Sequence, residues 1–339
     1  MKVPLLSLSR VITLAATLVL SGCATVYPPL GWTLGAYAED EVTPYVLSED
    51  DPNLAACGTG NGLTQLMASF SRVVESPDYV LFYTHLLTGL CAEEHAYEAD
   101  RRYWRARQQG QPVIARDELL QAQRWHALAA ERRMNSVTAL TRRYGDLDEP
   151  RCPRLRSRND ELAYMVGLVT ALQAVRSDLL SGGQVGVPRD LAVQAMRAST
   201  CLDNERWWGV PQAIRATVWS FVPGSAPDGA DVWQAYRQAG AIAARNGATL
   251  PLTLFALGAG NQGHDDELRE ALRQAAAILD AEMAPPKPYA LVDFISRGQL
   301  LYLSDQIWIE QTGARTPAGA LGTFPGESRR PAPNIQDLL

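Results

Sequence analysis

The chain has 339 residues, of which 47% are hydrophobic and 20% are charged. This composition excludes a disordered chain, and the length is enough for one large or two ordinary domains with a buried core. Acidic residues outnumber basic ones by 37 to 31, which gives a formal charge of −6. Nucleic-acid-binding proteins normally carry a basic patch or stripe, so this balance argues against a nucleic-acid partner.

Residues 1–22 have the pattern of a bacterial lipoprotein signal peptide. Lys2 and Arg10 precede an apolar run that ends at Leu20. The run is too short for a membrane-spanning helix, which needs about 20 residues. Small residues then lead into Cys23, as in a lipoprotein cleavage site. We expect Cys23 to be the first residue of the mature protein and to carry acyl chains such as palmitate. The alternative is an uncleaved anchor helix with an unrelated cysteine.

The residues after this cysteine predict where the protein is held. Several acyl chains give a stable membrane anchor. Ala24 follows Cys23, and no aspartate stands there to favour retention at the inner membrane. We therefore expect an outer-membrane lipoprotein that faces the periplasm, with the inner membrane as the less favoured location. Residues 23–56 are rich in Pro, Tyr and Asp and show no regular period, which predicts a tether and lead-in.

Four further cysteines, Cys57, Cys91, Cys152 and Cys201, predict disulfide bonds in an oxidising compartment. None of their spacings is C-x-x-C, so neither a zinc site nor a redox motif is expected. Three pairings are possible. A helical hairpin turning near Pro77 would bring Cys57 and Cys91 to the same height, at 1.5 Å of rise per residue. Cys152 and Cys201 would join the next helical pair similarly. Four buried free thiols are the alternative.

From Gly62 onward the sequence predicts helix after helix. Apolar residues recur at intervals of three and four, and glycine or proline separates the segments. Helices are expected at about 61–76, 78–109, 115–144, 160–181, 188–198, 211–221, 231–245, 252–256, 265–279 and 290–311. No alternating strand pattern appears. The pattern predicts an all-α fold of antiparallel helical hairpins in series, an α-solenoid array. It forms a single helical-repeat domain over 57–311, followed by a flexible tail over 312–339.

Sequence motifs of catalysis and of cofactor or metal binding are missing. The four histidines form no H-x-x-x-H pair, and the consecutive residues Glu93, Glu94 and His95 would point to different sides of a helix. The glycines of 258–263 have a nucleotide-loop spacing but follow no strand, so we expect a flexible turn there. Basic residues such as Arg101 and Arg133 are interpreted as a solvated face near helix C-termini. We expect no enzyme activity, no cofactor and no metal.

Four tryptophans are the candidate ligand-binding residues: Trp207, Trp208, Trp219 and Trp233. Tryptophan rings often line apolar ligand channels. Packing between hairpins is the alternative for these side chains.

The order of short sequence words over 160–310 resembles the T-component lipoproteins associated with TRAP transporters (the TatT family). The words are Asp160-Glu161-Leu162-Ala163-Tyr164, Cys201-Leu202-Asp203, Trp207-Trp208-Gly209 and Asp265-Asp266-Glu267-Leu268, with Arg101-Arg102-Tyr103-Trp104 upstream. The resemblance implies a periplasmic protein of tetratricopeptide-like hairpins. It also implies assembly as a trimer around a pore, pairing with a periplasmic solute-binding protein, and passage of an apolar ligand or an organic acid.

We therefore expect a membrane-anchored binding or scaffold lipoprotein associated with a TRAP-type solute transport system. Two alternatives remain. One is a helical-repeat scaffold lipoprotein of an envelope secretion or outer-membrane assembly machine, and the other is a periplasmic enzyme.

Overall fold

The computed structural model describes residues 26–327, and in that range the chain forms helices and no strand. The all-α fold is thus confirmed. Residues 26–37 form an N-terminal helix. It is followed by η1 Ala38–Val42, α2 Thr43–Leu47, η2 Leu54–Gly60, α3 Asn61–Phe70, α4 Asp78–Gln108, α5 Pro112–Tyr144, α6 Arg158–Ser181, α7 Leu191–Ala198, η3 Ser199–Cys201, α8 Val210–Phe221, α9 Val232–Asn246, α10 Leu250–Gln262, α11 Asp265–Asp280, η4 Lys287–Tyr289 and α12 Ala290–Thr312. The predicted signal peptide and Cys23 lie outside the described residues.

Local capping chemistry sets the helix boundaries. Pro112 occupies the first position of α5, where the missing N–H is not needed. At the start of α6, the Ser157 hydroxyl accepts from the backbone N–H of Asp160 at 3.1 Å and donates to its carboxylate at 3.0 Å. Gly182 ends α6 in the left-handed conformation, with φ 84°.

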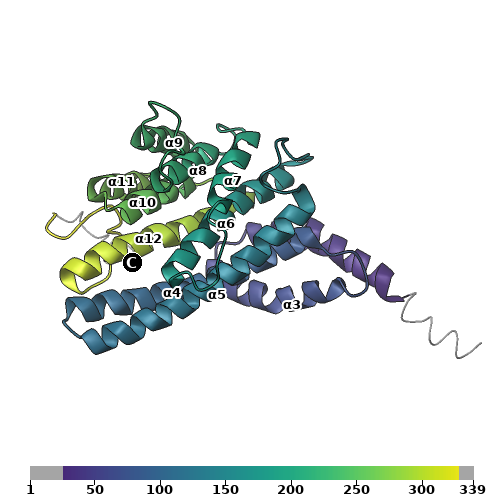
Figure 1. Ribbon diagram of the computed structural model, residues 1–339, viewed down its shortest axis with the longest axis horizontal. Coiled ribbons are helices and arrows are strands. Elements are labelled where there is room, and N and C mark those ends of the chain that lie inside the picture. Colours follow the sequence, from purple (N-terminus) through teal and green to yellow (C-terminus); the bar gives the residue numbers. More distant parts are fainter. Residues whose placement is uncertain (1–25, 328–339) are drawn as a thin grey trace, which may run out of the picture.

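Helices that are neighbours in sequence are mostly neighbours in space. The long helices α4 and α5 form an antiparallel pair, and α6 packs on α5 (Figure 1). Next, α7 connects α6 to α8, and α8, α9 and α11 all pack against α10. The arrangement of the helices as an α-solenoid array stays a prediction.

The last helix does not follow this order, because α12 runs back to α4 as well as packing on α10 (Figure 1). Arg101 of α4 forms an ion pair with Asp305 of α12 at 2.9 Å. The Tyr302 hydroxyl donates to Asp100 at 2.9 Å, and its ring stacks on Tyr97. The array is therefore closed by contacts between residues about 200 positions apart in sequence.

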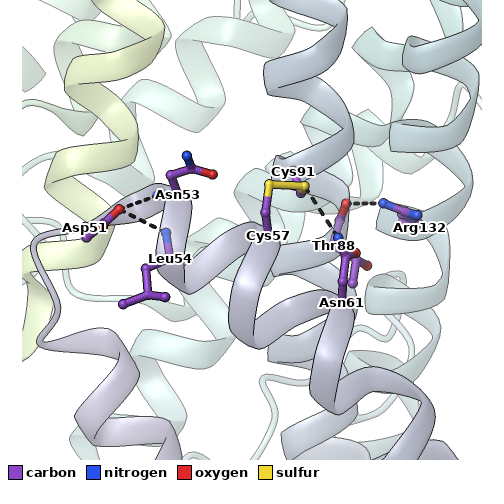
Figure 2. Close-up of a disulfide and its surroundings, with 8 residues drawn as sticks. All are labelled: Asp51, Asn53, Leu54, Cys57, Asn61, Thr88, Cys91 and Arg132. Carbon is purple, nitrogen blue, oxygen red and sulfur yellow. Dashed lines mark hydrogen bonds between the residues drawn. A yellow bond between two sulfur atoms is a disulfide. The ribbon is translucent and has the colours of Figure 1, made fainter.

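Both disulfides favoured by the hairpin geometry are present. Cys57 of η2 is bonded to Cys91 of α4 (Figure 2), and Cys152, which lies before α6, is bonded to Cys201 of η3. The first bond fastens the N-terminal region to α4. The second joins the lead-in to α6 to the end of α7.

The described parts of the predicted tether and tail pack onto the domain. In the N-terminal segment, Ala38, Leu47 and Ala55 are buried. Beyond α12, the Phe324 ring is buried under the guanidinium of Arg269, 4.6 Å from the ring centre. The folded domain is thus longer than the expected range 57–311 at both ends, because apolar side chains in both flanking segments are buried.

The glycine-containing segment 258–263 is another correction, because it is helical up to Gln262 and only Gly263 lies in the left-handed region. A glycine is needed at position 258 of α10 because the Tyr236 side chain packs directly on it. A Cβ atom there would overlap the tyrosine hydroxyl. Between residues 26 and 327, no helix is both long enough and apolar enough to cross a bilayer.

Candidate ligand-binding cavity

An apolar cavity of about 170 Å³ lies between the N-terminal region and the body of the domain. One wall comes from the N-terminal helix, η1, α2 and α3, and the other from α4, α6 and α12. Its lining includes Val42, Met67, Phe70, Leu87, Val169 and Ile295. An engineered apolar cavity of about 150 Å³ stays dry and binds benzene, so this volume accommodates a ring or a short aliphatic segment.

Apolar residues of the N-terminal wall follow a helical period in the sequence. Leu34, Ala38, Val42 and Val46 are spaced four residues apart, and all four line the cavity. The expected tether over 23–56, without a regular period, is therefore corrected for these residues. The spacing at 34–46 was the signal that could have predicted this wall.

The cavity opens at one side. Leu34, Tyr37 and Leu66 line it, yet their exposed fractions are 41%, 60% and 51%. These side chains form the mouth, where the cavity reaches the surface.

The hydroxyl groups of Thr170 and Ser296 in the lining donate hydrogen bonds to backbone carbonyls of their own helices. Thr170 donates to the Val166 carbonyl at 2.8 Å, and Ser296 donates to the Val292 carbonyl at 2.8 Å. Their donors are therefore occupied, and the cavity has little capacity to donate hydrogen bonds to a ligand along its length.

Polar groups gather where the cavity meets a second hollow. A second hollow of about 310 Å³, beside the Cys57–Cys91 disulfide, shares Leu90, Ile295 and Gln299 with the cavity. Gln299 stands at this junction, and its amide donates to the Glu93 carboxylate at 3.1 Å. The two spaces together offer an apolar cavity with a polar end.

Behind the junction lies a buried ion pair. Arg133 of α5 contacts Glu93 at 2.7 Å and donates to the Ser177 hydroxyl at 2.5 Å. Burial alone would raise the pKa of Glu93, but the nearby guanidinium groups of Arg133 and Arg176 hold it below its ordinary value. The carboxylate is therefore charged at neutral pH and holds Gln299 in place.

The basic residues of α4 and α5 are not all on a solvated face. Arg101 is 5% exposed and Arg133 is 1% exposed, and each is paired with a buried carboxylate. The expectation was wrong for these two because helix position does not show which arginine faces a carboxylate on a neighbouring helix. The side chains of Arg102 and Arg142 are exposed, as expected.

The four tryptophans do not meet in one site, and none of them lines the cavity. Trp207 and Trp208 are buried and pack edge to face against Tyr289, at ring-centre distances of 5.8 and 5.3 Å. Trp233 packs beside Phe255 and His264 at the other side of α10, and the half-buried Trp219 packs at the edge of the core. Their positions match packing between helices.

One cluster in the described part of the chain has the composition of a metal site, with ligand atoms of Cys57, Cys91 and His95 within 4.8 Å of one another. The two sulfur atoms are bonded to each other, so neither is a free thiolate ligand. The His95 ring stacks on Trp125 at 4.5 Å. In the disulfide form this cluster has no metal-binding chemistry.

Comparison of the chain with known protein families, with curated proteins and with solved structures found no match.

Proposed function

We propose that this protein is a periplasm-facing lipoprotein, anchored through acyl chains on Cys23, whose helical domain binds an apolar ligand. The cavity between the N-terminal region and α4, α6 and α12 is the observation that carries the proposal. Small-molecule sites are concave and mostly apolar, with a few polar groups that fix orientation. The ligand class is therefore an apolar ring or short chain with a small polar end that lies near Gln299.

We also propose that this binding serves a TRAP-type solute transport system, with a periplasmic solute-binding protein as partner and a homotrimer as the assembly. The sequence words over 160–310 and the binding cavity support this part of the proposal. Purification of the detergent-solubilised lipoprotein should recover a solute-binding protein. Recovery of secretion or outer-membrane assembly subunits in its place would favour the scaffold alternative.

Ligand binding is tested with fluorobenzene, a neutral single-ring probe of the size that the cavity accommodates, whose fluorine NMR line width rises when it is bound. The wild-type protein should give a saturable rise. Val169→Trp fills the cavity and should weaken probe binding about tenfold or more, because the ring is excluded from an apolar contact surface.

Val113→Trp is the matched control, because it adds the same ring at a side chain that is 73% exposed at the start of α5. This variant should bind the probe as the wild type does. Thermal melting shows whether each variant is folded. Equal probe affinity in a folded Val169→Trp protein would contradict the assignment of the cavity.

A further inference from the structure

The N-terminal helix, residues 26–37, carries an apolar stripe with no partner in the described structure. The stripe consists of Val26, Tyr27, Leu30, Leu34 and Tyr37, whose exposed fractions range from 41% to 60%. At 100° per residue, these five positions fall within one sector of about 100°. An apolar sector of this width is what a helix normally buries against another surface.

The other sides of this helix are occupied differently. Gly31 is buried and faces Val74, so the helix uses a small-residue side to contact the domain. Trp32 lies two positions from Leu30, about 200° around the axis, and is exposed. Trp32 therefore lies on the side opposite the stripe, and Leu34 marks the boundary between the stripe and the face that packs on the domain, because it also lines the cavity.

Charge along this segment is distributed unevenly. No charged residue occurs between positions 26 and 38, and three acidic residues, Glu39, Asp40 and Glu41, follow directly. An uncharged apolar helix that continues into the acidic π-helix η1 fits a segment that enters the interfacial layer only up to the acidic residues. With no basic residue in the segment, burial of apolar surface would supply the attraction, without help from anionic lipids.

The position of the stripe relative to the anchor identifies what covers it. Cys23 precedes Val26 by three residues, and a chain spans at most about 3.6 Å per residue, so the two Cα atoms are within about 11 Å of each other. This step rests on the proposed acylation of Cys23. An acylated Cys23 lies at the membrane surface, and the stripe then begins there too.

We propose that the apolar stripe lies in the interfacial layer of the membrane to which the protein is anchored. Tyrosine and tryptophan rings are favoured at this depth, and an uncharged helix with exposed apolar side chains buries apolar surface there. Leu34 and Tyr37 belong both to the stripe and to the mouth of the cavity. The mouth therefore opens against lipid, and the ligand class is an apolar molecule dissolved in the bilayer that enters without crossing water.

The test uses the mature protein, purified from membranes and reconstituted into phosphatidylcholine vesicles with a photoactivatable diazirine in the acyl chains. After irradiation, peptide mass spectrometry should find lipid adducts on stripe residues such as Leu30 and Leu34. Trp32 should be labelled at least about fivefold less, because it faces water. Leu30→Asp should lower labelling of the helix about tenfold.

Trp32→Asp is the matched control, because it introduces the same charge on the opposite side of the same helix, and labelling should stay within about twofold. Intact mass first reports whether Cys23 is acylated. An unmodified Cys23 would overturn both the proposed anchor and this inference. An acylated protein whose stripe stays unlabelled, or whose stripe residues crosslink to a second copy, would overturn this inference and leave the anchor in place.

Discussion

Gly209 stands in a place that no side chain fits. It follows Trp208, which itself has a positive φ of 56°, and it leads into α8 with φ 85°. A Cβ atom here would lie 2.6 Å from the carbonyl oxygen of Ala239 in α9. The turn and the close approach of α9 therefore both depend on this glycine.

We expect Gly209→Ala to lower the free energy of unfolding by about 2–4 kcal/mol, from left-handed strain and backbone overlap together. Gly229→Ala is the control, since Gly229 has φ 74° and a Cβ atom added to it would meet no other atom within 4 Å. It should lose only the strain, about 1–2 kcal/mol. Urea unfolding followed by circular dichroism measures both. Equal losses would mean that the overlap with Ala239 adds nothing.

Single residues also mark the limit of what could be predicted from the sequence. The role of Gly247 as the end of α9 could be predicted, because a glycine after a run of helix formers is a local signal. The burial of Arg133 could not be predicted, because its partner Glu93 lies forty positions away on another helix. The pairing depends on how α4 and α5 are aligned, and no local pattern specifies that alignment.

At the scale of elements, the helices of the body could be predicted closely, whereas the N-terminal wall has only one local signal, the four-residue spacing of apolar residues over 34–46. Proline and glycine bound helices such as α4 and α5, so both their existence and their ends were visible in the sequence. The N-terminal wall is made of short α- and π-helical pieces interrupted by polar residues. Its helicity depends on packing against α4 and α12, which a local pattern does not show.

The Cys57–Cys91 disulfide holds this wall on α4. We expect removal of either disulfide by paired serine substitution to lower the free energy of unfolding by about 2–4 kcal/mol. Only Cys57→Ser with Cys91→Ser should also speed hydrogen exchange in residues 26–70 and weaken probe binding, because only this bond joins the wall to the body.

The matched pair is Cys152→Ser with Cys201→Ser, whose exchange increase should be confined to the region of α6 and α7. Hydrogen-exchange mass spectrometry on both double variants separates the two effects. The same exchange pattern in both would show that the first disulfide does not specifically hold the cavity wall.

At the scale of the whole molecule, buried ion pairs and hydrogen bonds join α4 to α5 and to the distant helix α12. Glu93 pairs with Arg133 and accepts from Gln299, and Asp100 accepts from Tyr302, so α4 is connected to both α5 and α12. Replacing one member of a buried ion pair costs more than replacing an exposed one, because the remaining charge is left unpaired.

Because of this ion pair, the free energy of unfolding depends on pH. The pKa of Glu93 is lowered in the folded state from its ordinary value of 4.5, so the unfolded chain binds the proton more readily. The stabilisation that the charged Glu93 carboxylate gives to the folded state is complete above about pH 4.5. It is lost as pH falls through the folded-state pKa of Glu93. Glu93→Gln should lose about 3–5 kcal/mol at pH 7 and less at pH 3. Urea midpoints between about pH 3 and 7 measure this, and an unchanged difference across that range would contradict it.

The return of α12 to α4 has an evolutionary consequence. In an open row of helical hairpins, duplicating one hairpin lengthens the protein and leaves the rest undisturbed. Here α12 contacts α4 and α10 at the same time. The distance between α4 and α10, which α12 has to span, depends on how many helices pack between them. An inserted or deleted hairpin would separate Arg101 from Asp305 and Tyr302 from Asp100. Relatives of this protein should therefore differ in loops and termini while keeping the same number of helices between α4 and α12.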